Sequence, residues 1–253
     1  MENKKVVIVM PAFNAAKTLK MTYDALPKAN YHNIILVDDG SSDDTIEIAK
    51  SLGLTVYLHS RNFGYGANQK TCYSEALKEK ADIIVMLHPD YQYEPALLPE
   101  IIRPIQEGKA DLVLGSRLLA GNALKQGMPW WKYISNRFLT YLENKTLGLK
   151  LSEYHTGYRA YSHELLGKIN FLVNSDKFVF DQEVIFQAAH NKFSIAEVAV
   201  PTKYFPEASS ASFYASCIYG MSILFLILKY LLHKTEIINF KQFEVFKNRY
   251  RKA

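Results

Sequence analysis

The residues that follow one short apolar run constrain this chain most. Residues 34–37 are apolar and mostly β-branched, and the run ends in Asp38-Asp39-Gly40-Ser41-Ser42. Such a run is typical of a strand buried on both faces of a parallel sheet. Its acidic end then lies at the carboxyl edge of the sheet, where open α/β sheets bind ligands. Asp38 and Asp39 could hold a base, a ribose or a phosphate-bound cation there, although a serine or aspartate in this run could instead simply cap the next helix.

The first half of the chain alternates between strand-like and helix-like patterns. Strand-like runs occupy residues 6–10, 34–37, 55–58, 83–87 and 112–114. Helical patterns lie between them, at residues 16–26, 45–51, 67–79 and 95–106. This alternation predicts βαβ units and an α/β fold with a mostly parallel central sheet flanked by helices.

The second half departs from this rhythm. We expect helices at residues 130–147 and near 178–190, and a strand near 193–200. These elements still need the sheet to bury their apolar faces, so the sequence predicts one domain over residues 1–208. Residues 209–253 form a tail that is first apolar and then basic.

The tail determines the expected location of the protein. The net charge of +5 lies entirely in residues 229–253, which contain seven Lys or Arg and two Glu. A basic segment beside an apolar one favours an anionic membrane surface over nucleic acid. The apolar part is borderline for a membrane span, so it could span, lie in the headgroup region or pack on the core, and we favour the headgroup region. The apolar run at residues 6–10 is too short for a signal peptide, which predicts a cytoplasmic protein at the inner face of the membrane.

Two loops after the early strands offer groups for a nucleotide. Pro11 ends the first strand, and Phe13 could stack on a base or serve as a buried aromatic staple. Gly64 lies in a loop with two glycines that opens a helix, where backbone and helix N-terminus favour phosphate. Lys70, one turn into that helix, could reach an anion.

The fourth and fifth strands end in groups suited to metal and phosphate. His88, Asp90 and Gln92 follow the fourth strand, and an imidazole, a carboxylate and an amide oxygen can together hold Mg²⁺ or Mn²⁺. A proline turn with a capping aspartate is the simpler alternative. Arg117, after the fifth strand, suits a phosphate clamp or a surface ion pair.

Later residues add further candidates. Asp181 and Glu183 lie on a predicted helix, and Lys203 follows a predicted strand. Asp181 could be a general base or hold an acceptor, and Lys203 could hold a phosphate. Without the earlier motifs, the two acidic residues would be read as a solvated helix face.

As a set, these motifs resemble the family 2 glycosyltransferases with the GT-A fold, most closely the polyprenyl (dolichyl) phosphate sugar synthases. The resemblance covers about residues 5–205. The matching stretches are Pro11-Ala12-Phe13-Asn14, Val37-Asp38-Asp39-Gly40-Ser41, Asn62-Phe63-Gly64-Tyr65-Gly66-Ala67, Asp90-Tyr91-Gln92, Gly115-Ser116-Arg117, Gly157-Tyr158-Arg159 and Asp181-Gln182-Glu183.

The resemblance implies roles for these residues. Positions around the nucleoside are matched by Pro11, Phe13, Asp38 and Asp39. Asp90 and Gln92 match metal or diphosphate positions. The basic residues Arg117, Arg159 and Lys203 are expected around the phosphates or the acceptor. The helix that carries the base in many members is matched by Asp181 and Glu183, of which Glu183 is also expected near the acceptor.

Two departures from the family pattern stand out. His88 occupies the first place of the aspartate–any–aspartate signature, which implies either imidazole ligation or a metal site held mainly by Asp90. Phe13 stands where tyrosine is usual, so a hydroxyl contact is lost.

The resemblance implies an inverting transfer of a hexose from a UDP- or GDP-linked sugar, with Mg²⁺ or Mn²⁺. The expected acceptor is polyprenyl phosphate, which is already anionic, so Asp181 would position it; a sugar hydroxyl would need Asp181 as base. The alternatives are transfer to a soluble glycan or protein, or a non-catalytic nucleotide-sugar-binding protein.

Overall fold

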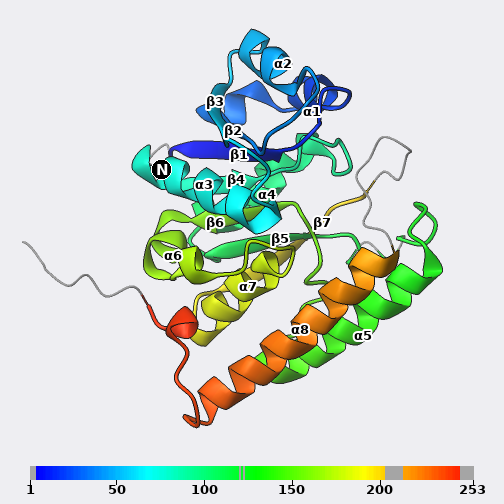
Figure 1. The fold of residues 1–253 in the computed structure, drawn as a ribbon, viewed down its shortest axis with the longest axis vertical. Helices are drawn as coiled ribbons and strands as arrows, with labels where there is room; N and C mark the ends of the chain where they lie inside the picture. The colour runs from blue at the N-terminus through cyan, green and yellow to red at the C-terminus, as the bar shows by residue number, and fades with distance from the viewer. Residues whose placement is uncertain (1–3, 120, 122, 203–212, 246–253) are drawn as a thin grey trace, which may run out of the picture.

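The computed structural model describes residues 4–119, 121, 123–202 and 213–245. Within these residues seven strands form one sheet, in the order β3-β2-β1-β4-β6-β5-β7 (Figure 1). The strands are β1 (Val6–Ala12), β2 (Asn33–Asp38), β3 (Thr55–Leu58), β4 (Ile83–Met86), β5 (Leu112–Ser116), β6 (Arg159–Ser162) and β7 (Ile195–Ala199).

The sheet is mostly parallel, as the sequence predicts. β1 pairs in parallel with β2 and β4, β2 with β3, and β5 with β7. The exception is β6, which lies between β4 and β5 and runs antiparallel to both. The sequence analysis did not predict β6, because its residues Arg-Ala-Tyr-Ser contain no apolar run.

Helices cover both faces of the sheet. The α-helices are α1 (Leu19–Asp24), α2 (Thr45–Ser51), α3 (Tyr65–Lys78), α4 (Leu98–Gln106), α5 (Trp130–Leu147), α6 (His163–Lys168), α7 (Phe180–His190) and α8 (Phe213–Lys234). Short 3-10 turns are η1 (Lys28–Asn30), η2 (Pro95–Leu97), η3 (Phe171–Val173) and η4 (Lys241–Phe243). α1, α2 and α4 pack on one face of the sheet, and α3, α6 and α7 pack on the other.

The central strand explains why the sheet carries a site at one edge. All seven residues of β1 are buried, because helices lie on both of its faces. Its register places Ala12 opposite Asp38, so β1 and β2 end together. The predicted helix at residues 45–51 is confirmed as α2, which follows the end of β2 in the chain.

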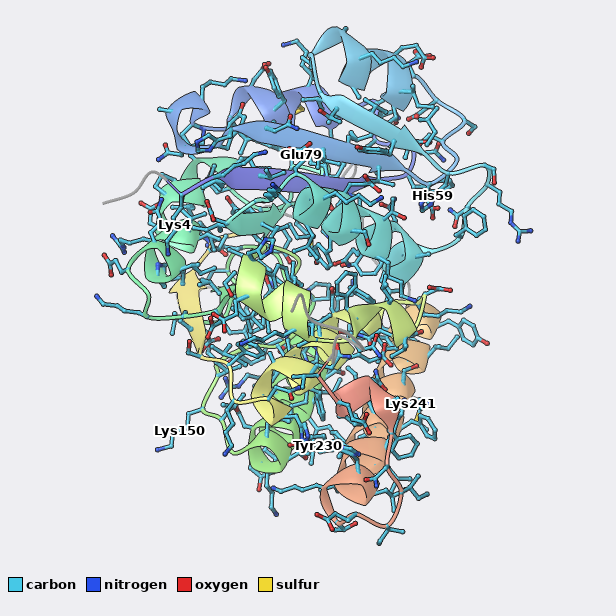
Figure 2. All side chains as sticks on the ribbon, turned by 90° about the vertical axis from the view of Figure 1, so that its left-hand side faces the viewer. Lys4, His59, Glu79, Lys150, Tyr230 and Lys241 are labelled. Carbon is cyan, nitrogen blue, oxygen red and sulfur yellow. The ribbon has the colours of Figure 1, made fainter. Side chains whose placement is uncertain are left out.

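α8 packs by one face only. It lies along α5 (Figure 1) and contacts α7, and its buried residues recur every third or fourth position. They join a small core with Phe186 of α7 and Phe243 of η4; the buried residues of α8 are Ile223, Leu226, Tyr230 and His233. Figure 2 shows Tyr230 in the half of the molecule opposite to His59, which follows β3. α8 thus packs on other helices rather than on the sheet. Among the described helices it is also the one that is long and apolar enough to cross a membrane.

Candidate active site

A cavity of about 780 Å³ opens at the carboxyl ends of β1, β4 and β5. Most of the residues singled out in the sequence line it, together with side chains of α5 and α8. Those residues are Pro11, Phe13, Asp39, Gly64, His88, Asp90, Gln92, Arg117, Arg159 and Asp181. Asp38, Lys70 and Glu183 lie outside its lining, and Lys203 lies outside the described residues.

Asp39 has an extensive set of donors. Its Oδ1 lies 2.6 Å from Nδ1 of His59 and accepts the backbone N–H of Phe63 at 3.0 Å. Its Oδ2 accepts the N–H of Gly64 at 2.9 Å. The carboxylate therefore ties the end of β2 to the loop that opens α3, as well as facing the cavity.

Asp38, the last residue of β2, precedes Asp39 and is almost fully buried. Its Oδ2 accepts the N–H groups of Gly40 at 3.0 Å and Ser41 at 2.8 Å, which shapes the turn. Its Oδ1 is buried and receives no hydrogen bond from any residue that the structure describes. A buried carboxylate oxygen without a donor is costly. Because Asp38 lies outside the cavity lining, its contact with a nucleoside stays a prediction.

The loop that opens α3 packs closely against a neighbouring segment. Gly64 has φ +106°, and a Cβ there would lie 2.7 Å from the carbonyl oxygen of Asp176. Lys70 contacts the same segment, since its Nζ pairs with the Asp176 carboxylate at 2.7 Å and donates to the carbonyl of Asn174 at 2.5 Å. In this structure Lys70 contacts residues 174–176, and its contact with a ligand anion stays a prediction.

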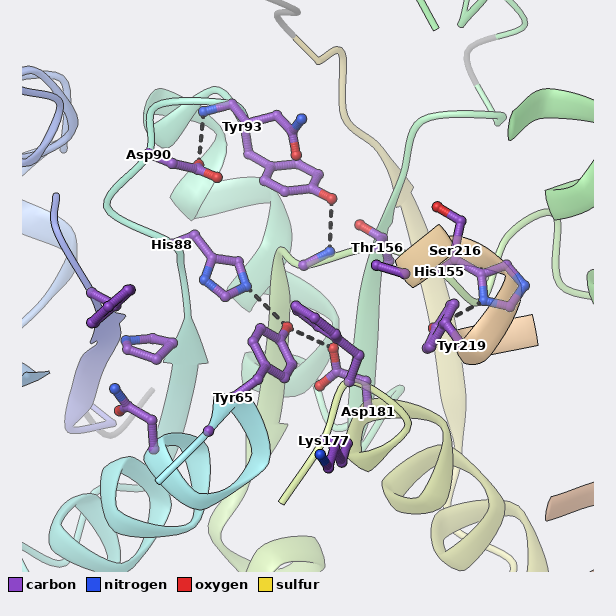
Figure 3. Close-up of a pocket in the computed structure, with 18 of the residues that line it drawn as sticks. Tyr65, His88, Asp90, Tyr93, His155, Thr156, Lys177, Asp181, Ser216 and Tyr219 are labelled. Atoms are coloured by element: carbon purple, nitrogen blue, oxygen red, sulfur yellow. Dashed lines mark hydrogen bonds between the residues drawn. The ribbon is translucent and has the colours of Figure 1, made fainter. Parts of the chain in front are cut away.

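Tyr65 connects His88 with Asp181 inside the cavity (Figure 3). Its hydroxyl donates to Oδ2 of Asp181 at 2.8 Å and lies 3.0 Å from Nε2 of His88. Burial, followed by the charge of Asp181, raises the pKa of Tyr65 well above its ordinary value, so the phenol keeps its proton. Because that proton goes to Asp181, the Tyr65 oxygen accepts from His88, which assigns the His88 proton to Nε2 and leaves a lone pair on Nδ1.

Asp181 is surrounded by donors. Besides Tyr65, Nε2 of Gln69 donates to its Oδ1 at 3.0 Å, and a guanidinium nitrogen of Arg159 lies 3.4 Å from the same oxygen. The residue is 6% exposed. These contacts occupy both carboxylate oxygens and fix the position of the side chain.

Arg159 and Glu183 are built into the protein frame. Arg159 is fully buried and donates to the backbone carbonyls of Tyr154, Thr156 and Asp181. Glu183 accepts the N–H of Ser175 at 2.6 Å, and burial raises its pKa. Both contacts hold the loops around the cavity in place.

Arg117 is fixed at the cavity rim by Glu153, which is fully buried. The Arg117 Nε donates to Oε1 of Glu153 at 2.8 Å, and its backbone N–H donates to Oε2 at 2.7 Å. One terminal nitrogen also donates to the carbonyl of His155 at 2.6 Å. A guanidinium held in this way is preorganised to meet an anion in the cavity.

A divalent ion fits the loop after β4 only with help from a ligand. Among the described residues, no three His, Cys, Asp or Glu side chains gather closely enough to hold a metal alone. His88, Asp90 and Gln92 do line one side of the cavity, and Asp90 accepts the Gln92 N–H at 3.0 Å. Their nitrogen and oxygen donors suit Mn²⁺ or Mg²⁺ when diphosphate oxygens and water complete the shell.

The cavity residues that the sequence analysis missed include Tyr65, Lys132, His155 and Tyr219. Tyr65 lies within the glycine-containing stretch, but its contact with Asp181 joins residues 116 positions apart. Lys132 and Tyr219 lie on helices whose periodicity predicts only helix. No local signal marks which face of these helices meets the cavity.

Comparison with solved structures identifies the fold of this protein. The fold matches glucosyl-3-phosphoglycerate synthase from Mycobacterium tuberculosis in complex with Mn²⁺, UDP and glucosyl-3-phosphoglycerate, with a TM-score of 0.68. The match covers 90% of this chain and 80% of that chain at 17% sequence identity. The architecture is therefore a GT-A-like α/β fold.

Family comparison is more specific and confirms the resemblance seen in the sequence. Glycosyl transferase family 2 matches residues 7–169, and the chain belongs to this family as a nucleotide-sugar-dependent glycosyltransferase. An uncharacterized protein of Methanocaldococcus jannaschii is 34% identical, over 88% of this chain and 91% of its own length.

Two named relatives transfer sugars to lipid phosphates according to their names. UDP-N-acetylglucosamine–dolichyl-phosphate N-acetylglucosaminyltransferase of Methanococcus voltae is 29% identical, over 81% of this chain and 88% of that protein. Polyprenol monophosphomannose synthase of Mycolicibacterium smegmatis is 26% identical, over 78% of this chain and 77% of that protein.

Proposed function

We propose that this enzyme transfers a hexose, with inversion, from a UDP- or GDP-linked sugar to a polyprenyl phosphate at a membrane surface. One observation carries this proposal. The wall of the cavity opposite the sheet is built by α5 and α8, and the outer faces of the same two helices are apolar and exposed.

The exposed apolar residues form a stripe on each helix, with a recurrence of three or four positions. The stripes consist of Trp130, Ile134, Phe138 and Tyr141 on α5, and Tyr214, Ile218, Met221, Phe225 and Leu228 on α8. Paired stripes of this size are rare on a soluble surface and suit the headgroup region of a bilayer. A lipid acceptor would then meet the cavity at the same face that binds the membrane.

The state of Asp181 supports an acceptor that needs no base. A polyprenyl phosphate is anionic at neutral pH, whereas a sugar hydroxyl must lose a proton as it attacks. Because Tyr65, Gln69 and Arg159 all donate to or pair with Asp181, this carboxylate suits positioning rather than proton abstraction.

Two cations on the acceptor side support a phosphate. Lys132 of α5 lines the cavity with Arg117, and burial, followed by the nearby charge of Arg117, lowers the pKa of Lys132. Like charges held close together favour binding of an anion between them. Arg117 and Lys132 are therefore the proposed partners of the acceptor phosphate.

On the donor side, the diphosphate would lie beside His88 and Asp90. A bound Mg²⁺ or Mn²⁺ there would neutralise the departing nucleoside diphosphate. Asp90 and Nδ1 of His88 are the proposed protein ligands, with Gln92 beside them. The acceptor phosphate oxygen attacks the anomeric carbon from the opposite face, and the bonding pair leaves with the diphosphate.

A transfer assay tests the acceptor. UDP-N-acetylglucosamine and GDP-mannose are offered in parallel with Mn²⁺, each with undecaprenyl phosphate in detergent micelles and with a soluble glycoside. We expect sugar to enter the lipid fraction. Transfer to the soluble glycoside alone, or donor binding without transfer to either, would overturn the proposal.

A paired variant tests the membrane surface. Phe225→Glu places a charge in the α8 stripe, whereas Leu58→Glu places it on β3, at a residue of similar exposure. Phe225→Glu is expected to reduce co-sedimentation with phosphatidylglycerol vesicles about tenfold, because a charge must be desolvated to enter the interface. Leu58→Glu should sediment like the parent. Equal sedimentation of both variants would contradict the proposed surface.

A further inference from the structure

Glu143 of α5 is a buried acid that the reaction described above does not use. It is fully buried, and neither of its carboxylate oxygens receives a hydrogen bond from a described residue. Nε2 of His155 lies 3.2 Å from Oε2, close enough for an ion pair although too poorly aligned for a hydrogen bond. A buried carboxylate in this state is costly unless a positive charge faces it.

The contacts of His155 assign its proton. Nδ1 lies 3.2 Å from both the amide nitrogen of Gln182 and the hydroxyl of Tyr219. The Gln182 amide nitrogen also donates to the carbonyl of Tyr154, which fixes the orientation of the amide. Burial raises the pKa of Tyr219 well above its ordinary value, so this hydroxyl is a donor as well. With two donors facing Nδ1, the imidazole proton lies on Nε2, toward Glu143.

This series of contacts ends in the cavity. His155 and Tyr219 both line it, and Figure 3 shows the contact between them on the side of the pocket formed by α8. Arg117, the proposed partner of the acceptor phosphate, donates to the backbone carbonyl of His155. The buried acid is thus connected, through one imidazole and one phenol, to the acceptor side.

We propose that Glu143, His155 and Tyr219 form a relay that takes up one proton when a phosphate monoester binds; this inference rests on the acceptor proposed above. Without ligand, Tyr219 donates to His155, so its oxygen presents only lone pairs to the cavity, and these repel a phosphate dianion. A solvent proton on Nδ1 reverses the hydrogen bonds. His155 then donates to the Tyr219 oxygen, and Tyr219 donates its own proton to the phosphate. The Gln182 amide loses its hydrogen bond to Nδ1 in this step and keeps the one to the Tyr154 carbonyl.

The charges around His155 explain why the ligand is needed. Glu143 on α5 lies 3.2 Å from Nε2 and favours a positive charge on the ring, whereas the Arg117 guanidinium, which donates to the His155 carbonyl, opposes it. Asp181 on α7 acts on the neighbouring Tyr219. Tyr219 on α8 is uncharged, and Gln182 on α7 contributes only its dipole. A bound phosphate dianion adds the negative charge that tips this balance. Tyr219 would contact the substrate, and Glu143 would be a positioning residue that acts through His155.

Calorimetry in buffers of different ionisation enthalpy measures this proton directly. At about pH 8 a phosphate monoester is a dianion, because its second pKa is about 6. Undecaprenyl phosphate in micelles and inorganic phosphate are titrated into the full-length protein, with UDP as a donor-side control. We expect uptake of about one proton for each phosphate monoester bound. Binding of UDP should cause no proton uptake that depends on His155.

Variants separate the relay from the rest of the site. His155→Asn and Tyr219→Phe should bind without proton uptake, and Glu143→Gln should reduce the uptake. His163→Asn is the control, because His163 contacts the Ala81 carbonyl outside the cavity and its loss should leave the uptake unchanged. The measurement on the unaltered protein decides the outcome even if a variant fails to fold.

The outcomes are distinguishable. Uptake with both phosphates, or with the lipid phosphate alone, supports the relay and shows whether the headgroup suffices for it. Binding without proton uptake, or uptake that persists in His155→Asn, overturns the relay and leaves the acceptor assignment standing. If neither phosphate binds, both the relay and the acceptor assignment are overturned.

Discussion

The Tyr65 hydroxyl lies 3.0 Å from Nε2 of His88 and also donates to Asp181. The contact links a residue of the donor side to the carboxylate that the family pattern suggests as a base. It fixes the His88 tautomer and occupies one oxygen of Asp181. One phenol thus affects both halves of the site, as carboxylates behind metal-binding histidines do in other proteins.

Removing this hydroxyl should destabilise the protein. Tyr65→Phe leaves Oδ2 of buried Asp181 without its donor, and an unsatisfied buried polar atom costs about 1–3 kcal/mol. The free energy of unfolding is measured by urea titration. Tyr141→Phe, at an exposed position of α5, is the control and should change stability by less than about 0.5 kcal/mol. Equal stability of both variants would show that Tyr65 does not satisfy Asp181.

The lone pair on Nδ1 of His88 leads us to predict that this nitrogen coordinates the metal. With UDP and Mn²⁺ bound, electron spin-echo spectra should show modulation from a directly coordinated imidazole nitrogen. His88→Asp should abolish this modulation while Mn²⁺ binding persists, because a carboxylate replaces the nitrogen and accepts either ion. Mn²⁺ bound in the unaltered protein without nitrogen modulation would exclude His88 as a ligand.

Gly157 makes room for the His88 ring. A Cβ at this position would lie 2.8 Å from Cδ2 and 3.1 Å from Nε2 of His88, so Gly157→Ala must move the imidazole. We expect the affinity for UDP with Mn²⁺ to fall about tenfold, or about 1.4 kcal/mol. Gly167→Ala is the matched control, since beyond its own chain neighbours and helix backbone no atom lies within 4 Å of the added methyl group, and it should bind UDP normally.

The pair of Arg117 with Glu153 should contribute to stability as well as to function. Arg117→Ala leaves the Glu153 carboxylate buried without its cation, which costs about 3–5 kcal/mol. Lys109→Ala breaks an exposed pair with Glu107 and should cost less than about 1 kcal/mol. Denaturant titration of both variants compares the two effects, and similar losses would contradict the burial argument.

Glu183 predicts a dependence of stability on pH. Burial raises its pKa in the folded state, against the Ser175 N–H, so the folded protein holds this proton more tightly than the unfolded chain. Its contribution to stability is full below the unfolded value of 4.5 and is lost as pH rises through the folded pKa. Glu183→Gln should therefore gain stability relative to the parent as pH rises above 4.5.

A residue with the opposite shift provides the control. A hydrogen bond to Lys109 lowers the pKa of exposed Glu107, so its small contribution is present at higher pH and lost on acidification. Glu107→Gln should show a weak trend of opposite sign. Parallel curves for the Glu183→Gln variant and the parent would refute the assignment.

Local sequence determined much of this protein. Apolar runs and helical periodicity extend over a few residues, and they predicted the βα alternation, the bounds of α2 and the acidic end of β2. Because carboxyl ends of parallel strands meet at one edge, the sequence also placed Asp39, His88 and Arg117 around one site. The motif set further identified the family.

The tertiary structure decided what those residues do there. β6 enters the sheet between β4 and β5 although its own sequence lacks a strand pattern, because its partners supply the burial. Asp181 receives a donor from Tyr65, which is 116 positions away, and Glu143 meets His155 through the packing of α5. Such contacts depend on how distant elements pack, and no periodicity within either segment encodes them. The sequence predicted an apolar helix at α8. Which of its faces joins the core and which stays exposed depends on packing with distant helices, and only the structure showed it.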